Sequence, residues 1–368
     1  MIDFEDLLIK FEDFEVNNDF IIDVHNNHEY NKIIVEYYKR LIEEQSSLSR
    51  KFGSMIPLSK VHELENCNKF WNIDVYQQNC IKDYVGTFLC RDKFCSNCKK
   101  VKQAVRMSRY IDYIKNYKDS LYHVVFTVPN CQGVDLRRTL KKMTLTFRKL
   151  MRIIQGNYRC FVDFKLYKYL ACLRSLEITF KRDLYHPHFH CAFVFKNLDL
   201  EKNIVNKYSY SNKSSEIRLF SEFEILLQKL WYMLYNDISI TKENYDKLDC
   251  GYSCMVDKFR DDDYMELFKY MTKSTDEDDD LLTYDNFKTL YFATYGVKQI
   301  QGYGLFYNIT DNDITQDEID SVYTSIKNFL SSDEKPVVTS ERPFDLLNDH
   351  NYLLISRKKI YQYLKSIK

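Results

Sequence analysis

The segments LRSLEITF (173–180) and HFHCAFVF (188–195) decide the fold of this 368-residue chain. Both are rich in β-branched and aromatic residues and are flanked by polar residues, a pattern that predicts β-strands. Only the polar stretch KRDLYHP (181–187) lies between them. Because so short a connection cannot carry a crossover between parallel strands, we expect an antiparallel hairpin.

Polar side chains recur on one face of this hairpin. Side chains at i and i+2 of a strand point to the same face, so His188 and His190 project together while Phe189 faces a core. If the strand register brings Glu177 opposite them, two imidazoles and one carboxylate form a site suited to a divalent cation that also binds a substrate oxygen. The alternative is a pair of hydrogen-bonded histidines beside a buried ion pair. His186, which precedes a proline, is not expected to be a ligand.

Helices and further strands surround the hairpin. We predict a strand at YHVVFTV (122–128), a helix with Asp135 as its N-cap, and helices at about 220–235 and 263–273. The apolar positions of the helix after Asp135 recur at spacings of four and three, which is typical of core packing. They are Leu136, Leu140, Met143, Phe147, Leu150 and Ile154. Strands and helices without a βα period predict an α+β fold with a central antiparallel sheet flanked by helices.

Charge is segregated along a chain whose formal net charge is zero. Residues 1–30 carry nine acids and one lysine, whereas residues 91–160 carry seventeen Lys or Arg and four Asp. The basic block predicts a phosphate-binding surface, or else one solvated helix face.

No stretch approaches the roughly 18 apolar residues of a membrane helix, and the acidic start is unlike a secretion signal. We therefore expect a soluble, unexported protein without a membrane partner. The odd count of eleven cysteines, four of them clustered, fits metal thiolates better than disulfides and predicts the reducing cytoplasm.

A cysteine cluster precedes the hairpin. The motif CRDKFCSNC (90–98) supplies three cysteines, and a fourth lies upstream, so the chain can close a tetrahedral thiolate site. The expected ligands are Cys67, Cys90, Cys95 and Cys98. Cys80 or His62 could replace Cys67. The spacing also matches plant-type iron–sulfur ligation, but a structural zinc is preferred because the motif runs into a basic helix and nothing else indicates electron transfer.

A third group of polar residues lies on the helix expected at about 263–273. Glu266, Tyr270 and Lys273 have helical spacing and would form one row. A phenol activated by a nearby cation or metal can act as a nucleophile, and a carboxylate one turn away can act as a general base. The alternative is a surface helix with an ion pair.

Together these motifs resemble the HUH endonucleases, specifically the replication initiators of small rolling-circle plasmids. The similarity covers roughly 62–305 and departs from the family at Lys93, where Arg is usual, and at Ser96, where Pro is usual. The matching stretches are CRDKFCSNC, FTVPN (126–130), LRSLEITF, HPHFH (186–190), YMTK (270–273) and ATYGVKQIQGYG (293–304).

The resemblance implies an HUH-type sheet and a site-specific enzyme that nicks and rejoins plasmid origin DNA, single-stranded at the nick and duplex beside it. Magnesium or manganese would be held by His188, His190 and Glu177, and Tyr270 would form a 5′-phosphotyrosyl intermediate. Glu266 would activate water late in the cycle, and Lys273 would stabilise charge. A host polymerase and a host helicase are expected partners, since no phosphate-binding G-x-x-x-x-G-K-[ST] loop is present. The expected contacts to the DNA backbone are Lys99, Lys100, Arg106, Arg137, Arg138, Lys141 and Lys142.

Four regions are expected along the chain. They are an acidic helical region (1–60), a cysteine zinc knuckle with its basic helix (61–110), an HUH nicking domain (111–310), and a linker with C-terminal helices (311–368). A homodimer is a candidate assembly. Two other functions fit the same motifs: an HUH-type transposase, and a noncatalytic zinc-containing regulator that binds DNA.

Overall fold

A computed structural model describes most of the chain in two units. The described residues are 18–48, 56–65, 67, 71–73, 76–77, 80–81, 84–87, 89–158, 160–200, 204–211, 217–260, 263–268, 283–309, 315, 317–318 and 321. By contacts the chain divides into Met1–Ile111 with Asp313–Lys368, and Asp112–Asn312. The four regions expected from the sequence stay a prediction.

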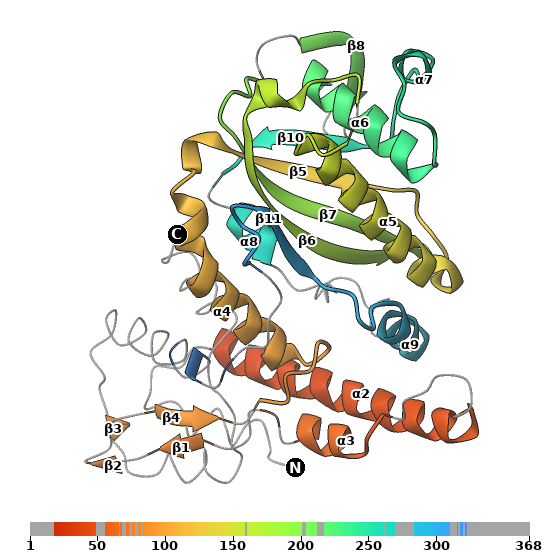
Figure 1. Ribbon diagram of the computed structural model, residues 1–368. Helices are drawn as coiled ribbons and strands as arrows, with labels where there is room; N and C mark the ends of the chain where they lie inside the picture. Colours follow the sequence, from red (N-terminus) through yellow and green to blue (C-terminus); the bar gives the residue numbers. More distant parts are fainter. Residues whose placement is uncertain are drawn as a thin grey trace. The chain divides into compact units, whose positions relative to one another are not determined.

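The second unit is built on a five-stranded sheet with the order β10-β5-β7-β6-β11, in which every neighbouring pair is antiparallel (Figure 1). Helices flank this sheet, so the predicted α+β class is confirmed. The strands are β5 Leu121–Thr127, β6 Tyr169–Lys181, β7 Leu184–Phe195, β10 Cys254–Lys258 and β11 Ile300–Gly304. A separate two-stranded sheet pairs β8 Ile204–Ser211 with β9 Ile217–Ser221.

The predicted antiparallel hairpin is β6 and β7, but its turn is shorter than expected. The strands continue to Lys181 and from Leu184, so only Arg182 and Asp183 connect them. Both have positive φ, 51° and 60°, as the favoured two-residue hairpin turn requires. The strands extend this far because Tyr185, expected in the loop, is buried and packs on the ring of Phe180 at 4.8 Å.

Two helices, α5 Gly133–Ile154 and α6 Glu222–Tyr235, cover one face of the sheet (Figure 1). All six apolar positions predicted for the core side of α5 are buried. The ring of Phe147 lies 5.4 Å from that of Phe189 and 5.7 Å from that of Phe126, which fixes this as the face of the odd-numbered β7 residues and even-numbered β5 residues.

The predicted N-cap of α5 was wrong by three residues. Gln132 is the N-cap, and Asp135 lies in the first turn, where its carboxylate favours the helix dipole and pairs with Arg138 at 2.9 Å. The helix starts earlier because Gly133 lets its backbone approach α9 Tyr284–Ala293. A Cβ atom at Gly133 would lie 3.0 Å from the side chain of Thr289.

The opposite face of the sheet carries α8 Asp263–Phe268, which contacts β6 and β7 and buries Leu267 and Phe268. The helix predicted at about 263–273 is described only to Phe268. The edge strand β11 falls in the glycine-containing segment 296–305. At Gly302 an added Cβ would meet the carbonyl oxygen of Phe306 at 1.6 Å, so only glycine admits the chain that folds back there.

The first unit contains the predicted N-terminal helical region and the cysteine segment. Its elements are α2 Asn18–Leu48, α3 Ser59–Glu65, α4 Ser96–Lys115, and the paired short strands β1 Trp71–Ile73 with β4 Tyr84–Thr87 and β2 Tyr76–Gln77 with β3 Cys80–Ile81. Helix α4 continues into the second unit. The remaining short helices of the second unit are η2 Lys118–Ser120, η3 Phe164–Tyr167 and α7 Lys242–Asp246.

Helix α2 lies within the region expected to be helical (1–60), and its last turns are held by a contact with a distant residue. Leu41 and Gln45 are buried, and Gln45 Oε1 accepts a hydrogen bond from the backbone N–H of Ile56 at 3.2 Å. This tertiary contact extends the helix to Leu48. Of the region expected to hold a linker and C-terminal helices (311–368), only residues 315, 317–318 and 321 are described. Among the described helices, none combines the length and apolarity that a membrane crossing requires.

Candidate functional site

The register of the β6–β7 hairpin brings Glu177 opposite His188, and Ser175 opposite His190. The Nε2 atoms of His188 and His190 lie 2.7 Å and 3.0 Å from the same carboxylate oxygen, Oε2 of Glu177. The register on which the sequence prediction depended is therefore the one that the hairpin adopts. One ligand atom from each of the three residues lies within 4.8 Å of the other two.

The burial and charge of these residues fit a divalent cation. The side chains of Glu177 and His190 are 8% and 11% exposed, whereas that of His188 is 18% exposed, so the group is most open beside His188. Burial opposes ionisation of Glu177, but the hydrogen bonds to both histidines hold its pKa well below its usual range. Burial lowers the pKa of His190, which favours the neutral imidazole that binds metals. An ionised carboxylate beside two imidazoles is a donor set for a divalent metal.

A second row of polar residues supports this group from β5 and α8. His123 Nε2 lies 3.1 Å from His190 Nδ1, and His123 Nδ1 lies 2.9 Å from Asp263 Oδ1. The rings of His123 and His190 stack with centroids 5.3 Å apart. The hydrogen-bonded side chains of Asp263, His123, His190 and Glu177 thus fix the orientation of the His190 ring and link α8 to the hairpin.

Neither His123 nor Asp263 was predicted from the sequence. The only local signal is a histidine inside the otherwise apolar stretch YHVVFTV (122–128). Its relevance depends on the pairing of Val125 with His190, which places His123 diagonally beside that histidine on the same face.

We expect His123→Ala to weaken binding of Mn²⁺ by roughly 10- to 100-fold, because a metal-bound imidazole loses orientation when its outer hydrogen-bond partner is removed. The matched control is His186→Ala, because His186 is also a histidine of the hairpin and its Nε2 lies 3.4 Å from the carbonyl oxygen of Lys181, outside the metal group. The variant keeps the backbone carbonyl of residue 186, which accepts a hydrogen bond from His188 Nδ1 at 3.0 Å. Calorimetric titration with MnCl₂ measures both. Equal affinities of the two variants would contradict a supporting role for His123.

Of the three catalytic residues predicted from the sequence, the structure describes only the backbone of Glu266. Glu266 lies on α8, which packs on the face of the histidines, but its side chain is outside the described residues. Tyr270 and Lys273 lie outside them entirely. Their predicted roles stay predictions.

The four cysteines expected to bind a metal form a second group, in the first unit. Cys67, Cys90, Cys95 and Cys98 are buried, and their Sγ atoms lie within 4.8 Å of one another. Cys67 is the fourth member rather than His62, and the side chain of Cys80 lies outside the described residues. Burial opposes ionisation of Cys95, but hydrogen bonds from the other three thiols hold its pKa well below its ordinary value. By contrast, a hydrogen bond with Cys90 raises the pKa of Cys67, and burial raises that of Cys98. The group therefore stabilises one thiolate, at Cys95, and a thiolate is the form that binds a metal.

Helix α2 holds the cysteine group in place. Asn31 donates to Cys95 Sγ at 3.5 Å and accepts from the backbone N–H of Ser96 at 3.0 Å. The hydroxyl of Tyr38 donates to Asp92 at 2.7 Å, and Asp92 in turn accepts from the backbone N–H of Phe94 at 2.8 Å. These contacts orient the thiolates in the way that outer hydrogen-bond partners orient metal ligands.

We expect purified wild-type chain to carry one zinc ion and Cys95→Ser to carry almost none, because the tetrahedral set loses a thiolate. The first unit of the variant should also lose its cooperative thermal transition, since metal binding and folding are coupled in such sites. Elemental analysis and a calorimetric melt measure the two effects. The matched control is Cys250→Ser, which changes an exposed free cysteine in the second unit. A full zinc ion in Cys95→Ser would exclude this site.

The seven residues expected to contact DNA fall into two sets. Lys99 and Arg106 on α4 are each 4% exposed, and the side chain of Lys100 is outside the described residues. By contrast, the cations expected on α5 lie on its outer side, where Arg137, Arg138 and Lys141 are exposed and Lys142 is half-buried.

Comparison with known proteins gives two findings. A family model described as "Replication protein" matches residues 83–342. Among curated proteins, "Protein rep" of Staphylococcus aureus is 26% identical over 231 residues, which are 60% of this chain and 82% of that protein. "Protein rep" of Streptococcus pneumoniae serotype 2 (strain D39 / NCTC 7466) is 26% identical over 144 residues, 37% of this chain and 42% of that protein. No solved structure matches the chain significantly.

Proposed function

The chain belongs to this replication protein family, and we propose that it initiates plasmid replication by cutting one strand of origin DNA and later rejoining it. The observation that carries the proposal is the convergence of Glu177, His188 and His190, whose ligand atoms lie within 4.8 Å of one another. A divalent ion at such a charged, partly open donor set can also bind a phosphate oxygen, which is what transfer chemistry at a phosphate requires.

The metal group is proposed to bind and orient the scissile phosphate. A divalent cation, magnesium or manganese, would polarise the phosphorus–oxygen bonds and neutralise charge as that phosphate is attacked. The low pKa of Glu177 keeps the carboxylate charged, and His123 with Asp263 keeps the His190 ring in one orientation. The more exposed edge at His188 is the side from which a single strand can approach.

Tyr270 is the proposed nucleophile. Its phenol gives up its proton to water, the phenolate oxygen attacks the phosphorus, the bond from phosphorus to the 3′ oxygen breaks, and the 3′ oxygen takes up a proton and leaves as a hydroxyl. The strand then has a 5′-phosphotyrosyl linkage and a free 3′ end for a host polymerase. Its place in the sequence supports this role, since it follows Phe268 by two positions and Phe268 ends α8, which packs on the hairpin strands β6 and β7.

Glu266 is proposed to act after this step, and Lys273 during it. Glu266 would accept a proton from the water that cuts the displaced strand, and Lys273 would stabilise negative charge on the phosphate or the phenolate. A host helicase would separate the strands. The cysteine group would hold a structural zinc in the first unit, and the nicking chemistry would reside in residues 111–310.

The test is incubation of the purified full chain with supercoiled plasmid bearing its origin, with MnCl₂. We expect open circles whose new 5′ end carries protein and whose 3′ end is extended by a polymerase. Cutting of transposon ends in place of the origin would indicate the transposase. Binding to the origin with no cutting under any divalent metal would indicate the noncatalytic regulator.

A further inference from the structure

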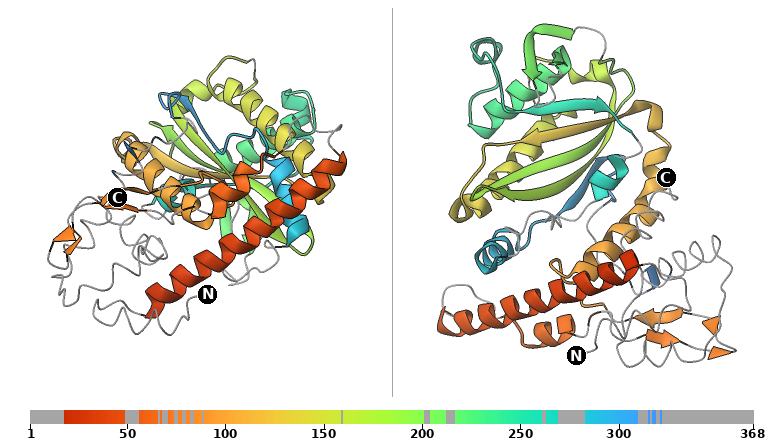
Figure 2. Two further views of the ribbon diagram at one scale, coloured as in Figure 1. Left: turned by 90° about the horizontal axis from the view of Figure 1, so that it is seen from below. Right: turned by 180° about the vertical axis from the view of Figure 1, so that it is seen from behind.

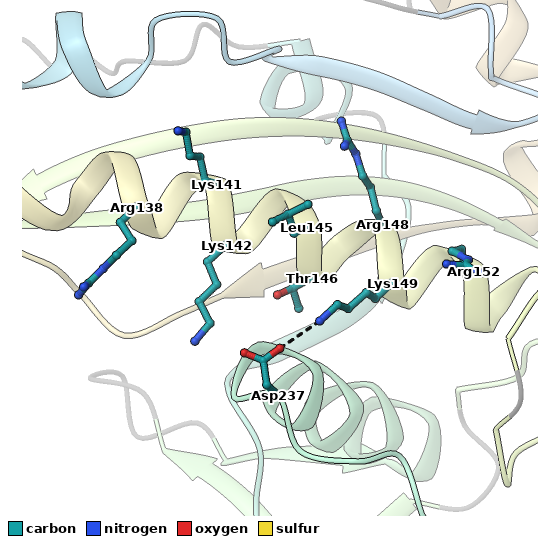
Figure 3. A pocket seen from close by; sticks show the side chains of 9 residues that line it. All are labelled: Arg138, Lys141, Lys142, Leu145, Thr146, Arg148, Lys149, Arg152 and Asp237. Atoms are coloured by element: carbon teal, nitrogen blue, oxygen red, sulfur yellow. Dashed lines mark hydrogen bonds and ion pairs between the residues drawn. The ribbon is translucent and has the colours of Figure 1, made fainter.

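A basic groove runs along the outer side of α5 (Figure 3). Its volume is about 570 Å³. Within the described part of the chain, its lining comprises six cations, two neutral residues and one acid. They are Arg138, Lys141, Lys142, Arg148, Lys149 and Arg152, with Leu145, Thr146 and Asp237. Figure 3 shows Lys142 and Lys149 on the side of Asp237, and Lys141 with Arg148 on the other side of the helix.

This groove and the metal group lie on opposite sides of the sheet. Helix α5 packs on the β7 face of Phe189 and Phe193, through Phe147. His188 and His190 have the opposite parity and point to the face that carries α8. The groove is on the side of α5 that is turned away from the sheet, so the sheet and a helix roughly 10 Å across separate it from Glu177. One phosphate cannot contact both sites.

We propose that the groove binds the phosphate backbone of duplex DNA, apart from the single strand held at the metal group. This inference rests on the proposed function and extends it to a second DNA segment. Six cations against one acid match a polyanion. None of the nine lining residues is aromatic, and the rings of Tyr235 and Tyr158 beside the groove lie under the cations of Lys142 and Arg152, at 4.5 Å and 5.9 Å. Surfaces that bind single strands instead stack bases on aromatic rings. About 21 Å of helix axis separates Arg138 from Arg152, which suits several successive backbone phosphates.

The acid in the groove competes with the DNA. Asp237, which has a φ of 55°, places its carboxylate 3.0 Å from Nζ of Lys149, at the edge where the loop after α6 meets α5. The hydrogen bond from Lys149 lowers the pKa of this carboxyl group, so it stays ionised. A phosphate entering the groove must displace this exposed ion pair or bind beside it.

The test compares two charge-matched double variants of the full chain. Lys142→Gln/Lys149→Gln removes two cations of the groove, and Lys242→Gln/Lys247→Gln removes two exposed lysines at the start and at the C-cap of α7. The probes are a labelled duplex from beside the origin nick and a short single strand spanning the nick. Binding is measured from 50 to 300 mM KCl, and cutting of the single strand is measured with MnCl₂.

Loss of two phosphate contacts should make the slope of log K for duplex binding against log[KCl] less negative by about 1.8. It should weaken duplex binding on the order of 50-fold at 0.1 M KCl. The groove variant should cut the short single strand at the wild-type rate, and the α7 variant should behave as wild type. Asp237→Asn, which tolerates the left-handed backbone, should bind the duplex several-fold more tightly at low salt.

Unchanged duplex binding by the groove variant would overturn the inference. Equal losses for duplex and single strand, or slower cutting of the short strand, would overturn the assignment to duplex. If the wild type cuts nothing while the groove variant still loses duplex binding alone, the groove stands and the nicking function fails, so the two proposals are separable.

Discussion

Replacing Tyr270 with phenylalanine is expected to abolish nicking of origin DNA, with a rate at least about 10⁴-fold below that of the wild type. The change removes only the phenol oxygen that we propose as the nucleophile, so no 5′-linked intermediate can form. Duplex binding should be unchanged, because the basic groove on α5 is proposed to hold the duplex independently of the cutting step. Conversion of supercoiled plasmid to open circles measures the rate, and a gel-shift assay measures binding.

The matched control is Tyr264→Phe, which removes a hydroxyl from the same stretch of chain. It should nick at close to the wild-type rate. Wild-type cutting by Tyr270→Phe would exclude Tyr270 as the nucleophile. Replication that persists in the absence of nicking would indicate a regulator.

Replacing Glu177 with alanine is expected to lower the nicking rate on the order of 10³-fold or more, because both histidines lose the carboxylate that they share. Mn²⁺ affinity should fall with it, and raising MnCl₂ should restore part of the activity. Rescue by metal separates a ligand from a residue that only holds the fold together. Metal titration and initial nicking rates measure the two effects.

Glu243→Ala is the control for loss of one carboxylate, since Glu243 is exposed on α7 and forms an ion pair with Lys247, the C-cap of the same helix. A thermal melt of Glu177→Ala checks that its sheet is intact. Mn²⁺ affinity equal to that of the wild type would show that the carboxylate is not a ligand, and the alternative of hydrogen-bonded histidines beside a buried ion pair would then hold.

The sequence predicted the parts of this site that depend on local periodicity. Alternation along a strand was enough to place His188 and His190 on one face and Phe189 on the other. The short connection was enough to predict that β6 and β7 are antiparallel. The apolar spacing from Leu136 to Ile154 likewise predicted which side of α5 is buried, because a helix repeats every 3.6 residues.

What the sequence did not predict depends on contacts between segments that are distant along the chain. His123 and Asp263 are 140 residues apart in the sequence. The pairing of β5 with β7 brings His123 to His190, and the packing of α8 brings Asp263 to His123. The N-cap of α5 was wrong because contact with α9 at Gly133, rather than the capping preference of Asp135, decides where the helix begins. Asp237 reaches the basic groove for the same reason, through the packing of α6 on α5.

The most direct measurement of the central claim is identification of the amino acid that becomes linked to DNA. The full chain is incubated with a single strand that spans the origin nick and MnCl₂, then digested, and the nucleotide-bearing peptide is sequenced by mass spectrometry. We predict one linkage, from the 5′ phosphate at the nick to Tyr270, and none with Glu177→Ala. Cutting without any linked peptide, or a linkage to a different residue, would contradict the account.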